Sequence, residues 1–270
     1  MPTQAEKGQL FRTLHERDQA FIIPNPWDAG TARLLAHLGF EALATTSAGY
    51  AFSVGQRDNT IERDEMMTHV AAIASATDLP VSADLENGFG DSAEIVAETI
   101  RLAAGAGLAG CSIEDMARNK TIYEHARAVE RVRAAVEAAR SLPFTFTLTA
   151  RAENYLVGKR DLKNTIQRLQ AYQEAGANVL YAPGLTTKED IAAVVRSVDR
   201  PVNVVMGLQD VQLGLAELSA IGVKRISVGS ALSRAALGAF LRAAREMRER
   251  GTFTFAADAV SYRDISEMFT

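Results

Sequence analysis

Residues 102–115 read LAAGAGLAGCSIED, an amphipathic stretch that ends in glycine and continues into a short apolar run closed by two acids. Three other segments repeat this order of features: AHLGFEALATTS (36–47), QEAGANVLYAP (173–183) and SAIGVKRISVGS (219–230). The glycines that end the four stretches are Gly39, Gly107, Gly176 and Gly222. A glycine takes the left-handed conformation of a helix C-terminus without steric cost, so each segment predicts a helix end followed by a buried strand.

Four more strands are expected beside prolines, at 21–24, 80–84, 144–149 and 201–205. Helical stretches separate most of the eight strands. Strands that alternate with helices pair in parallel, because a helix is the usual crossover between them. Eight such units in 270 residues predict an α/β fold of the closed (β/α)8 type, which usually needs about 250 residues. An open doubly wound sheet is the alternative.

The polar residues of the predicted strands fall on one face, because residues two apart in a strand point the same way. Ser82 shares a face with Asp84, and Ser112 shares a face with Glu114. In the strand that follows, three threonines share a face with Arg151, and the opposite face is apolar. The pattern predicts a polar barrel interior and apolar faces turned toward the helices.

The composition is that of a globular protein with no bias toward nucleic acid or membrane. The chain has 47% hydrophobic and 23% charged residues and a formal net charge of −4, so it lacks the excess positive charge that binds phosphate backbones. No apolar run approaches the roughly 20 residues that span a bilayer, and the N-terminal residues are too polar for a signal peptide. The single cysteine, Cys111, excludes an internal disulfide framework. We expect a cytoplasmic protein without nucleic-acid or membrane partners.

No linker or change in composition marks a second domain, so residues 1–270 are expected to form one barrel domain. The last part of the chain, 252–270, contains four aromatic residues. It predicts a C-terminal helical extension that docks beyond the eighth barrel helix.

Acidic side chains gather where the predicted strands end, which is the edge of a barrel that carries the active site. Asp84 and Glu86 follow one strand, and Glu114 ends the next. Glu153 lies two residues beyond Arg151 at the end of another. Carboxylate oxygens suit a hard cation, Mg²⁺ or Mn²⁺, in an octahedral shell. Zinc is disfavoured, because the four histidines are scattered and none ends a predicted strand.

Each of these residues also has a structural explanation. Asp84 or Glu114 could cap the following helix, and Arg151 could simply pair with Glu153 or Glu114. Their joint placement favours a metal site, with Arg151 binding a substrate carboxylate or a developing oxyanion. The run GAGLAG (105–110) matches G-x-G-x-x-G but leads from a helix into a strand, which is the reverse of a dinucleotide site.

Five short segments together resemble the isocitrate lyase/phosphoenolpyruvate mutase superfamily. They are PWDAG (26–30), TTSAG (45–49), DLENGFG (84–90), IED (113–115) and ARAE (150–153). The resemblance covers nearly the whole chain. It implies a (β/α)8 barrel whose last helix is exchanged between the subunits of a homo-oligomer, a dimer or tetramer. It also implies Mg²⁺ and a small carboxylate substrate at the mouth of the barrel.

The resemblance assigns roles to individual residues. The segment that binds the substrate carboxylate corresponds to Ser47, Ala48 and Gly49. The metal-site acids correspond to Asp84, Glu86 and Glu114, with Asp58 as a further acid near the metal. The arginine that binds substrate corresponds to Arg151, and a polar group across the mouth corresponds to Asn203.

Two departures from the superfamily pattern stand out. Glu86 replaces an acid that is typically Asp, and the stretch 116–125 lacks the Lys-Lys-Cys-Gly-His loop of the isocitrate and methylisocitrate lyases, whose cysteine acts as acid and base. The candidates for proton transfer are therefore Tyr50, Tyr155, Glu153, Lys120 and His125. We expect Tyr50 in the catalytic set with Arg151, Glu114 and Asp58, and we place Glu153 with the substrate-binding residues.

These features predict a Mg²⁺-dependent lyase or decarboxylase for a small 2-oxo or 2-hydroxy di- or tricarboxylate, which reacts through a metal-stabilised enolate. One alternative is an enzyme of the phosphonopyruvate hydrolase or phosphoenolpyruvate mutase type, which breaks a phosphorus–carbon bond. Another is a non-catalytic protein that binds 2-oxo acids.

Overall fold

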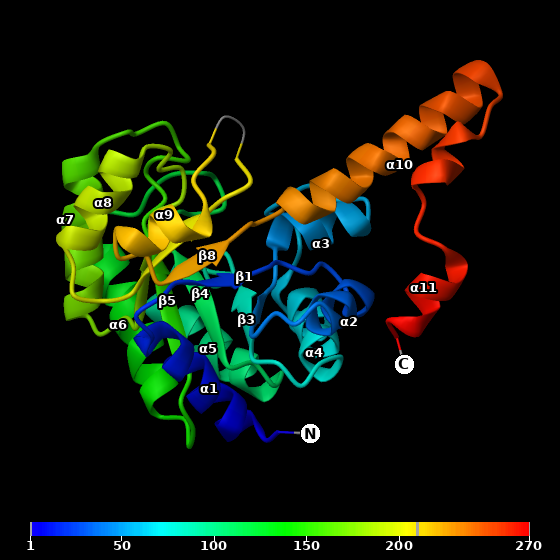
Figure 1. Cartoon of the computed structure of the whole chain (residues 1–270). Coiled ribbons are helices and arrows are strands. Elements are labelled where there is room, and N and C mark those ends of the chain that lie inside the picture. Colours follow the sequence, from blue (N-terminus) through cyan, green and yellow to red (C-terminus); the bar gives the residue numbers. More distant parts are fainter. Residues whose placement is uncertain (1, 209–210, 270) are drawn as a thin grey trace.

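The chain folds into a barrel of eight parallel strands surrounded by helices (Figure 1). The computed structural model describes residues 2–208 and 211–269. Hydrogen-bonded neighbours follow the order β1-β8-β7-β6-β5-β4-β3-β2. At the remaining seam, between β2 and β1, the Ala44 amide donates to the Pro24 carbonyl at 3.0 Å. The predicted (β/α)8 barrel is confirmed, and the open doubly wound sheet is not the fold.

The strands are β1 (Phe21–Ile23), β2 (Leu43–Ala44), β3 (Val81–Asp84), β4 (Gly110–Glu114), β5 (Thr147–Arg151), β6 (Val179–Tyr181), β7 (Val202–Val205) and β8 (Arg225–Ser227). The helices are α1 (Gln4–Glu16), α2 (Ala29–His37), α3 (Ser47–Ser53), α4 (Arg63–Ser75), α5 (Ala93–Gly105), α6 (His125–Arg140), α7 (Leu162–Glu174), α8 (Lys188–Arg196), α9 (Leu215–Ala220), α10 (Ala231–Arg250) and α11 (Tyr262–Glu267), with a 3₁₀ turn η1 (Thr254–Asp258). Within the described ranges, none of these helices combines the length and the apolar character that crossing a membrane requires.

The glycine pattern of the sequence places the helix ends correctly. Gly39, Gly107, Gly176 and Gly222 have φ values of 83°, 87°, 104° and 90°. Each follows a helix and precedes a strand, as expected. The alternation within the strands is confirmed as well, because Ser82, Asp84, Ser112, Glu114 and Arg151 face the interior of the barrel. Their neighbours Val81, Ala83, Cys111, Ile113 and Leu148 lie in the hydrophobic core with the surrounding helices.

The fifth strand begins later than the sequence indicates. The prediction was 144–149, whereas β5 spans Thr147–Arg151. Its neighbour β4 starts at Gly110, which pairs with Thr147. The residues before Thr147 have no strand residue on β4 to pair with, so the ladder starts there.

Helix α1 closes the end of the barrel at which the strands begin (Figure 1). Phe11 and Leu14 of α1 form a small apolar cluster with Phe21 and Ile23 of β1 and with Ala42 and Ala109. A Cβ on Gly110 would lie 3.1 Å from the Phe11 ring and 2.4 Å from the Thr147 carbonyl oxygen. Glycine at this position therefore leaves the space in which the α1 side chains close the barrel.

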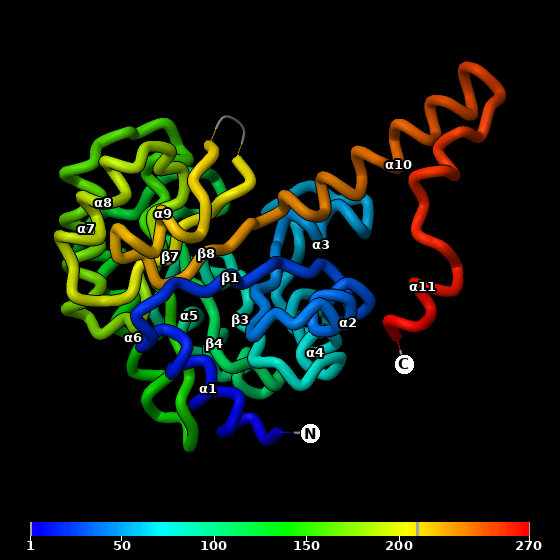
Figure 2. Tube along the Cα trace, in the orientation of Figure 1, coloured from blue at the N-terminus to red at the C-terminus, as the bar shows by residue number. Residues whose placement is uncertain are grey.

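The C-terminal extension, which the sequence predicts to dock beyond the eighth barrel helix, makes few contacts with the rest of the chain. Helix α10 leads away from the barrel, and the segment after it returns toward α2 and α4 (Figure 2). Phe253 and Tyr262 remain 66% and 88% exposed, and only Phe269 lies against residues of α2 and α4. The extension is helical, as predicted, but its aromatic residues are mostly not buried against this chain.

Candidate active site

The carboxyl ends of the strands surround a cavity of about 250 Å³. Residues of all the strands from β2 to β8, together with the loops that follow them, line it. This is the end of a (β/α)8 barrel at which active sites lie.

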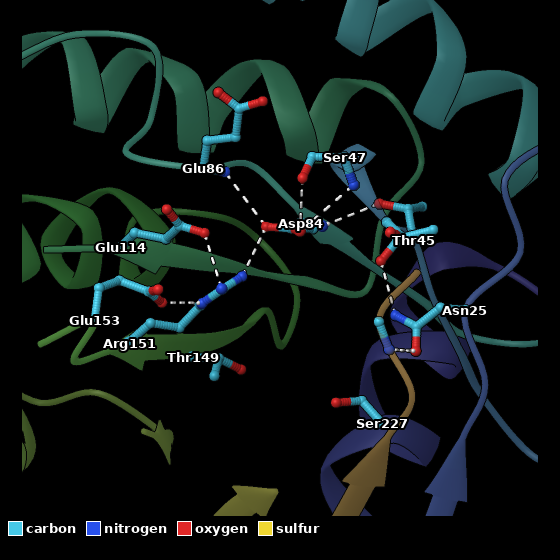
Figure 3. A network of polar contacts seen from close by, with 12 residues as sticks. Asn25, Thr45, Ser47, Asp84, Glu86, Glu114, Thr149, Arg151, Glu153 and Ser227 are labelled. Atoms are coloured by element: carbon cyan, nitrogen blue, oxygen red, sulfur yellow. Dashed lines mark hydrogen bonds and ion pairs between the residues drawn. The ribbon is translucent and has the colours of Figure 1, made fainter. Parts of the chain in front are cut away.

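Arg151 is the centre of the polar network at this cavity (Figure 3). Its Nη1 lies 3.0 Å from an oxygen of Asp84, its Nη2 lies 2.9 Å from Glu114, and its Nε lies 2.7 Å from Glu153. The guanidinium also packs against the Tyr181 ring, 4.9 Å from its centroid. β5 thus carries one buried cation that holds three carboxylates, which come from β3, β4 and the loop after β5.

Three acids around one cation leave a surplus of negative charge in a buried place. Burial alone would lower the pKa of Arg151, but the carboxylates of Glu114, Glu153 and Asp84 hold it well above its usual value. Burial raises the pKa of Glu153 to about 7, with Arg151 opposing the effect and Asp115 adding to it. Burial also raises the pKa of Glu114, again against the attraction of Arg151. Near neutral pH this group of acids can therefore take up or release a proton.

Ser47 connects Asp84 to a further acid. Its hydroxyl lies 3.1 Å from Asp84 Oδ2 and 3.0 Å from Asp58 Oδ1, and its amide lies 3.5 Å from the same Asp84 oxygen. Burial and the charge of Asp84 raise the pKa of Asp58. Ser47 begins α3, and Thr46 caps this helix by accepting from the Gly49 amide at 3.2 Å. The loop after β2 thereby fixes the position of the Ser47 hydroxyl over the acids.

Glu86 has an unusual environment. Its backbone φ is +49°, and both carboxyl oxygens are buried without a hydrogen-bond partner among the described residues. Its side chain points away from Arg151 (Figure 3). Burial raises the pKa of Glu86 to about 8, and the charges of Asp84 and Asp58 act in the same direction. A carboxyl in this environment is mostly neutral near pH 7, and a cation close by favours its ionised form.

Most of the residues expected from the sequence meet at the cavity. Those that line it are Ser47, Ala48, Asp58, Asp84, Glu114, Arg151, Glu153 and Asn203. Gly49 does not line it, because it lies inside the first turn of α3, where a Cβ would come within 2.5 Å of Thr46. Glu86 lies behind Asp84 rather than on the cavity wall.

The expectation that Tyr50 lies at the mouth of the cavity needs correction. Its ring stacks on His69 with a centroid distance of 3.6 Å, and its hydroxyl lies 3.1 Å from Glu65. Both partners belong to α4. Tyr50 is one helical turn beyond Thr46, on the side of α3 that faces α4, so its side chain is directed away from the cavity.

Two further residues, Asn25 and Asp115, hold the mouth of the barrel in place, and the sequence pattern does not single out either of them. Asn25, after β1, donates to the Thr45 carbonyl at 2.9 Å and accepts from the amides of Val228 and Gly229, so it ties the mouth of the barrel together across β1, β2 and β8. The only signal for it was its place at a strand end.

Asp115 follows Glu114, and strand alternation could have placed it on the helix-facing side. It accepts from Arg168 at 3.0 Å, from the Tyr172 hydroxyl and from the Glu153 amide at 2.8 Å. Arg168 also donates to the Tyr123 carbonyl. These bonds fix the ends of β4 and β5, and with them Glu114 and Glu153, against α7.

The stretch after β4 is a short hairpin. Met116 and Ile122 form an antiparallel bridge, and Met116 lines the cavity. Arg118 donates to Glu62 at 2.8 Å and to the Ile61 carbonyl at 2.7 Å. The hairpin therefore rests against the start of α4 beside the cavity.

The acids at the cavity suit a divalent cation that is held largely through water. Among the described residues, no three acidic, histidine or cysteine side chains stand close enough together to act as direct ligands of one ion. Asp58, Asp84 and Glu114 nevertheless line the same cavity, which has room for several water molecules. Burial and the charge of Asp84 raise the pKa of Asp58, and the Glu86 carboxyl has no hydrogen-bond partner among the described residues, so a cation in this cavity would favour the ionised form of both acids. Oxygen donors that share a hydrated cavity are the environment that Mg²⁺ prefers.

The chain is similar to known enzymes over nearly its whole length. The family model for phosphoenolpyruvate phosphomutase matches residues 11–248. A crystal structure from Burkholderia cenocepacia, described as a candidate lyase/mutase, is 65% identical, with a TM-score of 0.96, and the match covers 99% of this chain and 96% of that one. The 2-methylisocitrate lyase of Salmonella typhimurium is 33% identical over 66% of this chain and 63% of that protein.

A structure of phosphonopyruvate hydrolase in complex with oxalate and Mg²⁺ is 25% identical, with a TM-score of 0.86, over 99% of this chain and 95% of that one. The superfamily to which these proteins belong contains Mg²⁺-dependent lyases and mutase-like enzymes that act on carboxylates. The barrel, the cavity at its carboxyl end and the family match together show that this chain is an enzyme of the carbon–carbon lyase type and belongs to the isocitrate lyase/phosphoenolpyruvate mutase superfamily.

Proposed function

We propose that the enzyme is a Mg²⁺-dependent lyase or decarboxylase that breaks a carbon–carbon bond at C3, the carbon next to the 2-oxo or 2-hydroxy group, of a small di- or tricarboxylate. The observation that supports this most is the position of Arg151, a buried cation that joins three carboxylates at a cavity. When the C3–C4 bond of a 2-oxo acid breaks, its electron pair stays on C3 as an enolate, which places negative charge on the 2-oxo oxygen. A fixed arginine in a buried site stabilises such charge as it develops.

The donors of the loop after β2 would hold the substrate carboxylate. Ser47 and Ala48 line the cavity, and the Ser47 hydroxyl lies over Asp84. Asn203 lines the opposite side. Bound Mg²⁺, held by Asp58, Asp84 and Glu114, would supply a Lewis acid that withdraws charge from the 2-oxo group.

Glu153 is the residue best suited to move a proton in this cavity. It is buried and bonded to Arg151, and its pKa of about 7 matches the requirement for a general acid or base near neutral pH. Lys120 lies at the tip of the hairpin and His125 begins α6; neither of these residues nor Tyr155 lines the cavity. We therefore assign the proton transfer, which in other members belongs to the cysteine loop, to Glu153.

The experiment is an assay of the purified protein with Mg²⁺ and each of oxaloacetate, 2-methylisocitrate and 2,3-dimethylmalate. Formation of pyruvate or another 2-oxo product that EDTA abolishes is the expected result. R151M should be inactive, and E137Q, which changes an exposed acid on α6, should keep full activity. The absence of EDTA-sensitive turnover on all three substrates would overturn the proposal.

The same preparation distinguishes the two rival functions. Phosphate release from phosphonopyruvate would assign phosphorus–carbon chemistry to the site. Thermal stabilisation by oxalate plus Mg²⁺ with no turnover of any substrate would assign a binding protein.

We also propose that the protein is a homo-oligomer in which α10 packs on a second subunit. Leu237, Phe240 and Leu241 of α10 are 38%, 66% and 47% exposed, a degree of exposure that is unusual for an apolar stretch of one helix. Light scattering after gel filtration should give a mass of two or four chains. F240D should lower that mass, and a monomeric wild-type protein would contradict this assignment.

A further inference from the structure

Beneath the ring of acids, the interior of the barrel continues as a polar well. Five inward-facing residues form it, and we call them the lumen well: Ser82, Ser112, Asn203, Arg225 and Ser227. They come from β3, β4, β7 and β8, all of them line the same cavity as Arg151, and all of them are buried. The function proposed above assigns a role only to Asn203.

Arg225 is a buried cation whose partners are all neutral. Its Nε donates to Asn203 Oδ1 at 2.8 Å, and its Nη2 donates to Thr149 Oγ1 at 3.0 Å. Its Nη1 lies 3.5 Å from His15 Nε2. No carboxylate of the described residues lies within ion-pair distance of this guanidinium, although the residue is only 5% exposed.

His15 does not change this charge balance. Its Nδ1 lies 2.7 Å from the Phe11 carbonyl, which only accepts, so Nδ1 carries the proton and Nε2 is the acceptor for Arg225. Burial and the charge of Arg225 lower the pKa of His15 to about 3, so the ring is neutral at physiological pH. Burial also lowers the pKa of Arg225 to about 10, which still leaves it charged.

The contrast with Arg151 identifies what Arg225 lacks. Both arginines lie in one barrel interior, and Arg151 has three carboxylates whereas Arg225 has none. A buried charge without a counter-ion costs several kcal/mol, and neutral hydrogen bonds recover only a part of it. A guanidinium has five N–H donors, and the contacts above engage three of them.

The serines of the well add further donors. Ser112 is the register partner of Thr149, which binds Arg225, so its side chain lies beside that bond on the next strand. Ser82 lies on β3, one inward-facing position nearer the start of the strands, because its register partner is Gly110 and Ser112 pairs with Asp84. Within the described part of the chain, neither serine hydroxyl makes a side-chain hydrogen bond. The well thus combines one cation, free hydroxyl groups and open space.

We propose that the lumen well binds one small monovalent anion, a carboxylate or an ion of similar size, between Arg225 and the hydroxyls of Ser82 and Ser112. The anion is either the second carboxylate of the substrate or a free anion such as chloride or bicarbonate. Only the first of these sources rests on the proposed function. In both cases the anion supplies the negative charge that no carboxylate of the described residues provides to Arg225.

The site itself is tested without any assay of activity. Crystals of the wild-type protein soaked in sodium bromide should show an anomalous peak within hydrogen-bond distance of Arg225. R225Q should lose that peak and R225K should keep it, whereas R234Q, which removes an exposed arginine at the mouth of the same cavity, should leave it unchanged. A wild-type well that stays empty while bromide occupies surface sites would overturn the proposal. If R225Q does not fold, S82A combined with S112A serves in its place, with a weaker peak expected.

The source of the anion follows from kinetics. If the substrate supplies the anion, R225Q should lower kcat/KM for a dicarboxylate about tenfold or more, which corresponds to the loss of one charged hydrogen bond. R225Q should leave kcat/KM unchanged for the analogue in which that carboxyl is an ester. If a free anion supplies it, chloride or bicarbonate should change the activity of the wild type but not of R225Q. No turnover would refute the proposed function and leave the bromide result to decide the site. Equal loss on both substrates with no bromide in the well would make Arg225 a structural residue and end the proposal.

Discussion

Replacing Glu86 by glutamine should remove a large pH dependence of stability. The Glu86 carboxyl is buried without a partner, and its pKa is about 8 in the folded protein against an ordinary 4.5. Between these two values the folded protein keeps a proton that the unfolded chain releases. The contribution of Glu86 to the free energy of unfolding is fully present below pH 4.5, and it is lost as the pH rises toward 8.

The size of the effect follows from the shift. One pKa unit corresponds to 1.36 kcal/mol, so metal-free wild-type protein should lose on the order of 4 kcal/mol between pH 5 and pH 8 through this group alone. For a chain of this length, one kcal/mol changes the melting temperature by about 2–4 °C, which predicts a decrease of roughly 10 °C. E86Q has no charge to bury at this position. Its melting temperature should therefore fall by roughly 10 °C less than that of the wild type between pH 5 and pH 8.

The assay is thermal unfolding in EDTA at intervals from pH 4.5 to pH 8.5, for the wild type, E86Q and the control E137Q. E137Q changes an exposed acid of α6 and should follow the wild type. The other buried acids titrate in all three proteins, so the difference between the curves isolates Glu86. Mg²⁺ should reduce the decrease in the wild type, because a cation beside Asp84 and Asp58 favours the ionised carboxyl. Parallel curves for wild type and E86Q would refute the reasoning.

Three further substitutions test other parts of the structure. R151K keeps the charge but not the three directed bonds, so it should lower kcat/KM on the active substrate by about 100-fold or more; a loss below tenfold would contradict the role of Arg151. G110A places a Cβ 2.4 Å from the Thr147 carbonyl oxygen and should lower the free energy of unfolding in urea by about 1–3 kcal/mol. Its control is G105A, whose Cβ would meet no neighbouring atom within 4 Å, and whose free energy of unfolding should stay within about 1 kcal/mol of the wild-type value. D115N breaks a buried ion pair with α7 and should cost about 3–5 kcal/mol; equal stability of D115N and wild type would show that this pair does not fix the strand ends.

The architecture was predictable because the signals for it are local. A glycine that ends a helix and an apolar run behind it depend only on neighbouring residues, and the repetition of this unit specifies the parallel barrel. The start of β5 was not predictable, because it depends on where β4 begins. The path of α10 and the segment after it depends on surfaces that no local pattern describes.

The candidate site was predictable where strand alternation governs it. Asp84, Glu114 and Arg151 lie at strand ends, and their direction follows from the period of two. Tyr50 and Glu86 lie in the segments after the strands, where the period is lost, and both point away from the cavity. The charge state of an interior residue such as Arg225 depends on partners from other strands, so no pattern in the sequence indicates it.

The proposed function requires the acids around Arg151 to hold a divalent cation against a small carboxylate. Titration calorimetry of oxalate into the wild-type protein, with Mg²⁺ and separately with EDTA, tests this claim most directly, and D84N serves as the comparison. Mg²⁺ should strengthen the binding of oxalate at least about tenfold, and D84N should abolish it. Equal oxalate affinity with Mg²⁺ and with EDTA, or unchanged binding by D84N, would contradict it.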